Sequence, residues 1–343
     1  MAHRDPASPG WALAARSKAL WAALAAAGGR GGAPLARALE WQATGSLLLA
    51  TTADEVEALQ RRAELLRAQG LEGVVLLSPR ELKMHEPALR LPPGSHGLLV
   101  QSDAQINGKR TAWGLLDDCK ALGAGGGAGG RLLLGLDEPV LALEPRSAGA
   151  GVDVVTSRRS RGGDTCSRCP APGMPPLRTG MMELSYTQHY SAGGASGGAG
   201  GSEGGGGAGG SSSAEGVDIT FTATTSVAGS LLIGSSREFS GWEVAPSADI
   251  VAAIMARATA FLPDLAAVAP EQLLGTTRVG LRPFALGGLP AVGRVPGLPG
   301  VAVAAGHEGS GLCLGPATAE LAPGSSPPAA ERRRAARAAR HLH

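Results

Sequence analysis

One segment combines small residues, a histidine and a carboxylate in an arrangement that could carry chemistry. Gly306-His307-Glu308-Gly309-Ser310-Gly311-Leu312 follows an apolar run, 301–305, and overlaps the start of a helix-forming segment, 311–321. Backbone N–H groups in such a turn can approach a ligand closely and stabilise negative charge on it near a helix start. The segment is therefore a candidate ligand contact. The alternative is a glycine-rich turn with a hydrogen-bonded histidine.

A second candidate is Arg282, in the sequence Gly280-Leu-Arg-Pro283. It follows residues 273–281, where the pattern predicts a strand. A guanidinium binds a carboxylate through two parallel hydrogen bonds, so an arginine at a strand end suits recognition of an acidic group. The alternative is an ordinary surface arginine. Arg278, earlier in the same strand, is either a second cation or part of a structural ion pair.

The cysteines do not indicate a metal site. Cys166 and Cys169 form a lone Cys-x-x-Cys, and no second pair stands at a spacing that would complete four zinc ligands. Pro170 and Pro172 follow, whereas a redox-active pair should open a helix. We interpret these cysteines as incidental loop residues and predict no metal.

Helices and strands alternate over the first 120 residues. Thr52 and Glu55 form a capping box before an apolar stripe, which predicts a helix ending at Gly70. Another helix is expected between Ser8 and Gly28. The remaining expected elements are strands at 46–50, 74–77 and 98–100 and helices near 79–86 and 112–119. This alternation predicts an α+β or α/β fold.

The second half contains a break in this order. Residues 193–210 are almost entirely small and polar, and such glycine-rich tracts have nothing to bury. Order returns at 217–222, which alternates as a strand and is expected to pair with 230–233 in a hairpin. The other expected elements are strands at 131–134, 152–156, 273–281 and 301–305 and helices at 247–262 and 311–321.

Several ordered stretches resemble the D-amino-acid oxidase/glycine oxidase-like (DAO) family of FAD-dependent oxidoreductases. The first set is Leu39–Ala50, Glu86–Leu89 and Asp103–Asn107. The second is Leu231–Phe239, Gly280–Pro283, Gly288–Pro290 and Ala304–Leu312. Each short match is weak alone, but their order along the chain is the family's order.

The resemblance implies roles for the candidate residues. Arg282 matches the arginine that pairs with the substrate carboxylate, and Gly306, His307, Glu308, Gly309, Ser310, Gly311 and Leu312 match the loop that contacts the flavin edge. Related enzymes often place a tyrosine over the substrate near Tyr186. The alternative for Tyr186 and its neighbour Tyr190 is ordinary half-buried packing.

The resemblance also implies a fold: a glutathione-reductase-like FAD-binding domain with a mixed-sheet substrate domain. In the family, a strand, a Gly-x-Gly-x-x-Gly turn and a helix hold the FAD pyrophosphate. The one literal match, Gly125–Gly130, follows a helix and precedes a strand, which is the reverse context. We therefore expect an incomplete FAD domain. Our expected division is 1–157 (partial FAD domain and the first part of the substrate domain), 158–216 (low-complexity insertion), 217–322 (substrate strands and FAD-contacting segment) and 323–343 (basic disordered tail).

The function implied is oxidation of the C–N bond of a small amino acid or amine, with FAD accepting a hydride. The alternative is a truncated, non-catalytic family member, or part of a flavoprotein that does not bind FAD alone. The sequence does not decide whether the chain acts together with a partner subunit.

Composition excludes several other classes. A net charge of +2 without a clustered basic face argues against a nucleic-acid partner. No apolar run approaches the roughly 20 residues of a membrane helix. Four scattered cysteines fit a reducing environment, so the default compartment is the cytoplasm. The compartment stays unknown, because a targeting segment could be missing.

Overall fold

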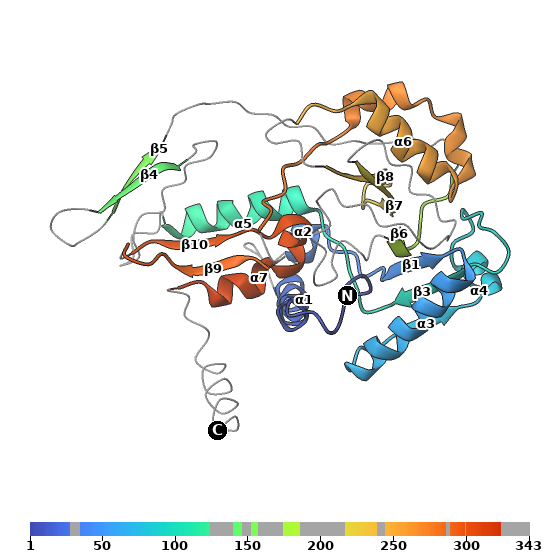
Figure 1. Ribbon diagram of the computed structural model, residues 1–343, viewed down its shortest axis with the longest axis horizontal. Coiled ribbons are helices and arrows are strands. Elements are labelled where there is room, and N and C mark those ends of the chain that lie inside the picture. Colours follow the sequence, from blue (N-terminus) through green and yellow to red (C-terminus); the bar gives the residue numbers. More distant parts are fainter. Residues whose placement is uncertain are drawn as a thin grey trace, which may run out of the picture. The chain divides into compact units, whose positions relative to one another are not determined.

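The computed structural model of the chain describes residues 1–27, 35–123, 140–145, 152–156, 174–185, 217–238, 244–285, 289–298 and 300–323. The chain divides into two compact units whose segments alternate along the sequence (Figure 1). Unit 1 comprises Met1–Trp11, Ala25–Leu132 and Gly163–Leu281. Unit 2 comprises Ala12–Leu24, Leu133–Gly162 and Arg282–His343. The four-part division expected from composition stays a prediction.

Unit 1 is built on a six-stranded sheet with the order β2-β3-β1-β6-β7-β8. Only β1 and β6 are paired in parallel, and the other neighbours are antiparallel, so the sheet is mixed. The hairpin expected from 217–222 and 230–233 is confirmed as β7 and β8. The strands are β1 (Ser46–Ala50), β2 (Val74–Leu77), β3 (His96–Val100), β6 (Gly180–Glu183), β7 (Asp218–Thr225) and β8 (Leu231–Arg237).

The central strand β1 is buried on both faces, as its unbroken apolar sequence predicts. Leu47 and Leu49 point into one hydrophobic cluster, while Leu48 and Ala50 point into the other. This alternation follows from the two-residue period of a strand. Unit 1 therefore has a core layer on each side of its sheet.

Helix α3 (Ala53–Ala68) covers one face. Thr52 accepts a hydrogen bond from the backbone N–H of Glu55, and the Glu55 carboxylate accepts one from the backbone of Thr52, so the predicted capping box is confirmed. The buried stripe of α3 packs in the same cluster as Leu48 and consists of Leu59, Ala63 and Leu66.

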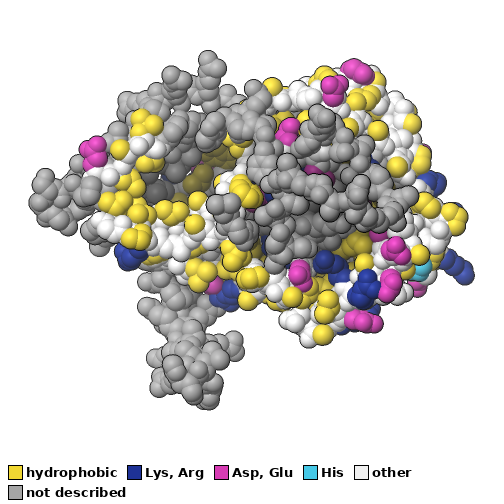
Figure 2. Space-filling view, viewed as in Figure 1, with side chains coloured by type: hydrophobic (Ala, Val, Ile, Leu, Met, Phe, Trp, Pro, Cys, Tyr) yellow, Lys and Arg dark blue, Asp and Glu magenta, His cyan; other side chains and the backbone are white. Residues whose placement is uncertain are grey.

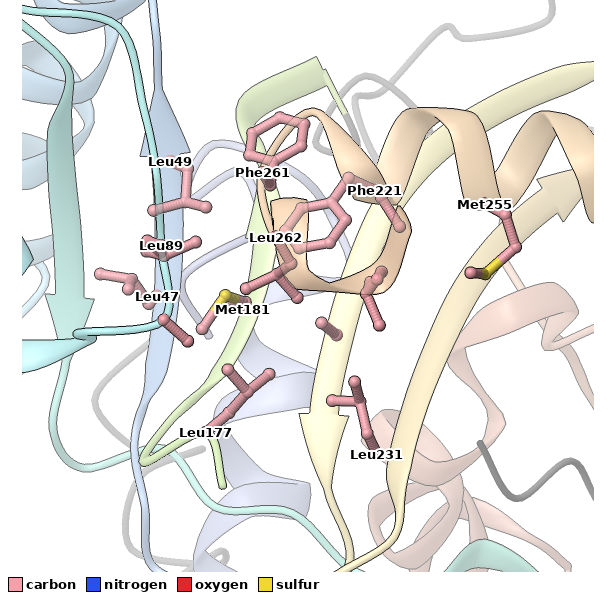
Figure 3. Packing of buried hydrophobic residues seen from close by; sticks show 14 of the residues in the cluster. Leu47, Leu49, Leu89, Leu177, Met181, Phe221, Leu231, Met255, Phe261 and Leu262 are labelled. Carbon is pink, nitrogen blue, oxygen red and sulfur yellow. The ribbon is translucent and has the colours of Figure 1, made fainter. Parts of the chain in front are cut away.

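The opposite face is covered by α4 (Pro79–His85) and α6 (Ala248–Thr259). Phe221 of β7 and Phe261, just after α6, stack with ring centroids 4.2 Å apart and an interplanar angle of 5°. Figure 3 shows these rings among the leucines and methionines of this cluster. Aromatic contact of this kind adds about 0.5–1.5 kcal/mol to the burial of the two side chains.

The strand predicted at 273–281 is wrong. After the 3₁₀ turn η2 (Pro263–Ala267), residues Pro270–Thr276 form a second 3₁₀ turn, η3, and 277–285 have no regular structure. The hydroxyls of Thr276 and Thr277 both donate to the carbonyl of Leu273, at 3.0 and 2.9 Å. Such local bonds favour a turn over a strand ladder, and alternation of residue types does not reveal them.

The remaining elements of unit 1 are two helices, α2 (Leu35–Leu39) and α5 (Gly108–Gly123), which contact each other. In unit 2, β4 (Val140–Pro145) and β5 (Val152–Thr156) pair as an antiparallel ribbon. The strand expected at 152–156 is thus confirmed, and the one expected at 131–134 lies outside the described residues. Among the residues the structure describes, no helix combines the length and apolarity needed to cross a membrane.

Unit 2 also contains β9 (Ala291–Arg294), β10 (Ala302–Ala305), α7 (Gly311–Leu321) and most of α1 (Trp11–Ala26). Pro316 lies inside α7 and has no N–H, so the carbonyl of Leu312, four residues earlier, lacks its helical donor. The indole N–H of Trp21 donates to this carbonyl at 2.6 Å. The next N–H, that of Ala317, donates to the Ser17 hydroxyl at 3.0 Å. Helix α1 therefore supplies the partners that let α7 contain a proline.

Candidate functional site

The candidate site is centred on Gly306–Leu312, which runs from the end of β10 into the first two residues of α7. We call this segment the site loop. Gly306 has a φ of +80°, and a Cβ built there would lie 2.7 Å from the Cβ of Ala285. Both the backbone conformation and the close approach require glycine. The start of the site loop is therefore held against Arg282–Ala285, which we call the arginine segment.

Glu308 joins the site loop to the arginine segment a second time. Its backbone N–H donates to the carbonyl of Pro283 at 3.1 Å, and its φ of +47° is unusual for a residue with a side chain. Its carboxylate accepts a hydrogen bond from the N–H of Gly309 and forms an ion pair with Arg282, with Nη1 and Oε1 3.3 Å apart. From the sequence, Arg282 is expected to bind a carboxylate and Glu308 to belong to a ligand-contacting turn. The structure shows that the two side chains are in contact.

The Arg282–Glu308 pair is partly open to solvent. The side chains are 32% and 18% exposed, respectively. An ion pair of this exposure remains accessible to a small ligand, and water weakens the attraction between its partners.

The His307 side chain faces helix α7. Its Nε2 lies 3.0 Å from the hydroxyl of Thr318, and the N–H of Ser310 donates to its carbonyl at 2.8 Å. Burial lowers the pKa of the His307 imidazole below its ordinary value. The imidazole is thus hydrogen-bonded to α7, as expected for a glycine-rich turn with a hydrogen-bonded histidine. A flavin contact from His307 would therefore come from its backbone.

The residues around the start of α7 differ in exposure. Ser310 is buried and occupies the N-cap position without a side-chain cap bond, whereas Gly309, Gly311 and Leu312 are exposed. The start of an eleven-residue helix without a side-chain cap favours negative charge nearby. This chemistry is compatible with a flavin that becomes negatively charged on reduction. Within the described ranges, no strand is followed by a Gly-x-Gly-x-x-Gly turn and a helix that would fit the FAD pyrophosphate.

The other residues predicted from the sequence are described only in part. Arg278 is exposed in unit 1, and Tyr186, Tyr190, Cys166 and Cys169 lie outside the described residues. The described part of the chain holds no group of three or more His, Cys, Asp or Glu side chains arranged for a metal ion.

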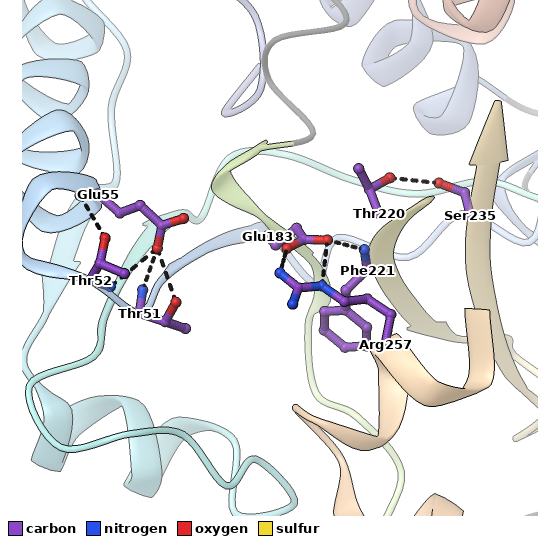
Figure 4. Close-up of polar contacts among 8 residues, drawn as sticks. All are labelled: Thr51, Thr52, Glu55, Glu183, Thr220, Phe221, Ser235 and Arg257. Carbon is purple, nitrogen blue, oxygen red and sulfur yellow. Dashed lines mark hydrogen bonds and ion pairs between the residues drawn. The ribbon is translucent and has the colours of Figure 1, made fainter. Parts of the chain in front are cut away.

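Unit 1 contains a second arginine–glutamate pair, on β6 and α6. The carboxylate of Glu183 accepts hydrogen bonds from the Arg257 guanidinium and from the backbone N–H of Phe221 (Figure 4). Arg257 also lies over the Phe261 ring, 5.2 Å from its centroid. Hydrogen bonding to Glu183 raises the pKa of Arg257. The Glu183 side chain is only 5% exposed and the Arg257 side chain is 29% exposed, so the carboxylate lies in the core and the guanidinium at its edge.

The two units present different surfaces. In Figure 2, Lys, Arg, Asp and Glu side chains gather over α3 and α4 of unit 1, whereas the face of β9 and β10 in unit 2 is mainly hydrophobic. Every residue of β10, Ala302–Ala305, is exposed. The site loop therefore follows an apolar ribbon.

The residues that support the site from α1 were not predicted from the sequence. The sequence predicts a helix between Ser8 and Gly28, which contains Ser17 and Trp21, but it predicts no contact of these residues with α7. Pro316 was the available signal, because a proline inside a predicted helix leaves one carbonyl in need of another donor. No spacing rule links residues about 300 positions apart, so only the structure identifies Trp21 and Ser17 as those partners.

The sequence model of the DAO family, described as FAD dependent oxidoreductase, matches residues 2–322. Glycine oxidase from Pseudomonas aeruginosa is 38% identical over 93 residues, which is 27% of this chain and 24% of that protein. Glycine oxidase from Pseudomonas putida is 37% identical over 97 residues, again 27% of this chain and 24% of the relative. The chain thus aligns with about a quarter of the length of these curated relatives.

Solved structures share the fold. Glycine oxidase from Geobacillus kaustophilus superposes with a TM-score of 0.64 at 22% identity, covering 92% of this chain and 80% of that one. Iminodiacetate oxidase from Chelativorans sp. BNC1 gives a TM-score of 0.61 at 16% identity, covering 95% and 85%. At these identities the likeness supports the fold, which is α+β with a mixed sheet.

Proposed function

The chain belongs to the DAO family of FAD-dependent oxidoreductases, and from this we propose that it oxidises the C–N bond of a small amino acid or amine. The observation that carries the proposal is the position of Arg282 beside the site loop. Its guanidinium lies 3.3 Å from Glu308, in the turn that the family resemblance assigns to the flavin edge. The arginine proposed to bind the substrate carboxylate therefore contacts the turn proposed to contact the cofactor, within unit 2.

Arg282 would bind and orient the substrate. A guanidinium that forks onto a carboxylate fixes the ligand in one plane, with charge-assisted hydrogen bonds worth roughly 1.5–3 kcal/mol each. Orientation of this kind accounts for much of the rate of reactions that need no strong acid or base. Tyr186 is proposed as a further substrate contact on the family resemblance.

The site loop would hold the cofactor's reactive end. We propose contacts from the backbone of Gly306 to Leu312, with the uncapped start of α7 stabilising negative charge. FAD, when bound, would supply the electron sink for a hydride equivalent from the substrate carbon. The resulting imine would then be hydrolysed by water to a carbonyl compound and an amine or ammonia.

The first test is flavin binding by the whole chain. The purified protein is mixed with excess FAD, separated by gel filtration and recorded between the near-ultraviolet and the blue. Flavin bands that co-elute with the protein are the expected result. Absence of co-eluting flavin would contradict cofactor binding by this chain alone.

The second test separates substrate binding from cofactor binding. Arg282→Ala should abolish turnover of carboxylate-bearing substrates and leave bound flavin in place, because the guanidinium contacts the substrate. Arg294→Ala is the matched control, since Arg294 is an exposed arginine of β9 in the same unit and pairs with Ala302, at the end of the ribbon away from the site loop. Equal loss of activity in both variants, or loss of flavin with Arg282→Ala, would count against the assigned role.

An alternative function is that of a partial flavoprotein, which binds FAD only together with another polypeptide. It is favoured by one observation: the described residues include no turn that fits the FAD pyrophosphate. Most of the affinity for FAD would then come from elsewhere, because the phosphates provide the strongest anchoring charge. Flavin that co-elutes with the purified chain would rule this alternative out.

A further inference from the structure

We propose that Trp21 is a positioning residue for the cofactor, which holds the first turn of α7 so that its backbone N–H groups face a bound flavin. Trp21 acts on the site loop, so this role rests on the proposed function. The residue belongs to α1 and stands 291 positions before its partner, Leu312. Both lie in unit 2.

Trp21 supplies a donor that α7 itself does not have. The helical donor for the carbonyl of Leu312 would be the N–H of the residue four positions later, and that residue is Pro316. The indole N–H of Trp21 donates to this carbonyl at 2.6 Å. Trp21 is buried, whereas the Leu312 side chain is exposed. Trp21 therefore holds the turn from the interior and does not occupy its exposed side.

A second bond from the same face of α1 fixes the rotation of α7. Ser17 lies four residues before Trp21, so the two side chains project from one face of the helix. The Ser17 hydroxyl accepts the N–H of Ala317 at 3.0 Å, and both residues are buried. One bond thus donates to the backbone of α7 and the other accepts from it, at separate turns. Two such bonds set both the position and the rotation of α7 relative to α1.

The carbonyl of Leu312 is rigidly coupled to a backbone N–H at the start of the helix. A peptide unit is planar, so this carbonyl and the N–H of Cys313 share one plane and point in opposite directions. Helical carbonyls point towards the C-terminus, so the N–H of Cys313 points towards the N-terminus of α7. Ser310, at the N-cap, makes no side-chain bond that would cap this turn. By fixing the carbonyl, Trp21 orients an N–H where it can stabilise negative charge on a reduced flavin.

The first measurement uses the full chain without flavin. Trp21→Phe keeps an aromatic ring in the core and removes the N–H donor. Hydrogen exchange measured by mass spectrometry should become about 3- to 10-fold faster for the amides of α7, which corresponds to the loss of one hydrogen bond. Trp11→Phe is the matched control, because Trp11 is a buried tryptophan of α1 that belongs to unit 1. It should leave exchange in α7 unchanged.

A donor restored within α7 separates the hydrogen bond from the packing of the indole ring. Pro316→Ala provides an N–H for the carbonyl of Leu312, so the helix no longer depends on Trp21 for this bond. Trp21→Phe combined with Pro316→Ala should therefore exchange no faster than Pro316→Ala alone. Thermal melting of each variant checks that it is folded.

The effect on the cofactor has a separate readout in the chain loaded with FAD. Trp21→Phe should make the reduction potential of the bound flavin more negative, by the amount that corresponds to an about 3- to 10-fold weaker preference for the reduced form. A residue that only supports the fold would weaken binding of both redox forms equally and leave the potential unchanged. Adding Pro316→Ala should restore the potential.

Three results would overturn the positioning role of Trp21. The first is unchanged exchange of α7 in folded Trp21→Phe, and the second is faster exchange that Pro316→Ala does not reverse. The third is an unchanged flavin potential in a Trp21→Phe variant whose α7 exchanges faster. Failure of the unmodified chain to retain FAD would contradict the proposed function of the chain alone. The exchange rates, which are measured without flavin, would then still support or overturn the control of α7 by Trp21.

Discussion

Two arginine–glutamate pairs, one from each unit, differ in the surroundings of the carboxylate. Glu183 in unit 1 is 5% exposed and accepts hydrogen bonds from both Arg257 and the backbone of Phe221. Glu308 in unit 2 is 18% exposed. The two arginines are similarly exposed, at 29% for Arg257 and 32% for Arg282. The same two residue types therefore place a carboxylate in a packed core in one unit and at a partly open loop in the other.

The difference follows from what covers each pair. Arg257 lies over Phe261, whose ring stacks on Phe221, so the aromatic pair and the guanidinium cover the buried Glu183 carboxylate. The site loop follows a ribbon with an exposed strand, β10. Burial makes an ion pair expensive to break, whereas exposure makes it cheap to exchange. The comparison can be tested by breaking each pair in turn.

The largest effect is expected from Arg257→Ala. Glu183 would remain buried without its cation, and breaking a fully buried pair typically costs about 3–5 kcal/mol. Because Arg257 is 29% exposed, we expect a loss at the lower end of this range, about 3 kcal/mol. Hydrogen exchange measured by mass spectrometry should show loss of protection in β6, β7 and α6. The exposed pair of Arg61 and Glu57 on α3 provides the control, and Arg61→Ala should cost no more than about 0.5 kcal/mol.

A double variant sharpens this prediction. Glu183→Gln combined with Arg257→Met removes both charges and keeps an acceptor oxygen for the N–H of Phe221. It should recover most of the stability lost in Arg257→Ala, because no uncompensated ion is then buried. If the double variant is as unstable as Arg257→Ala, the stability lost in Arg257→Ala does not come from the uncompensated charge of Glu183.

The next largest effect is expected from Gly306→Ala in unit 2. A side chain at φ +80° costs about 1–2 kcal/mol, and the clash with Ala285 adds roughly 1–3 kcal/mol. Gly297 has a φ of +76°, and a Cβ added there would meet no atom within 4 Å, so Gly297→Ala isolates the backbone cost. Equal losses in the two variants, measured by denaturant unfolding, would mean that the site loop is not pressed against the arginine segment.

A small effect on stability is expected from Glu308→Gln. A partly exposed ion pair contributes about 0–1 kcal/mol to folding, so the unfolding free energy should change by less than about 1 kcal/mol. A loss of stability comparable to that of Arg257→Ala would show that Arg282–Glu308 is a structural pair like the one in unit 1.

The smallest effect is a pH dependence from His307. Burial lowers the pKa of this imidazole in the folded state, so the folded chain prefers its neutral form. The stability it contributes is present above the unfolded pKa of about 6.5 and is lost as the pH falls through the lowered folded-state pKa. His307→Gln should flatten this part of the stability profile of unit 2. An unchanged profile from pH 7.5 to 5 would contradict the assignment.

Local signals predicted much of the fold. The capping box at Thr52 and Glu55 and the β7–β8 hairpin are confirmed, because each depends on residues close in the sequence. The strand expected at 273–281 was wrong, since Thr276 and Thr277 bond to the Leu273 carbonyl in a 3₁₀ turn. Alternation of residue types is shared by strands and irregular segments, and it does not report such bonds.

The candidate site also combines features that the local sequence predicts with contacts that it does not predict. The turn at Gly306 was identified from its glycines and its place between an apolar run and a helix, and both flanking elements are confirmed as β10 and α7. The ion pair of Arg282 with Glu308, 26 residues later, was not predicted. The hydrogen bonds that Trp21 and Ser17 make with the backbone of α7 were not predicted either. These contacts join distant segments, and many pairs of such residue types exist in any chain.

By itself, the sequence determined the family, the order of most helices and strands, and the residue types available to the site. These depend on patterns and on ordered motifs that are local in the chain. Only the tertiary structure decided which charges meet: Glu183 with Arg257 in a core, and Glu308 with Arg282 at an open loop. The strength of an ion pair depends on distance and surrounding dielectric, and both are set by packing between segments far apart in the sequence.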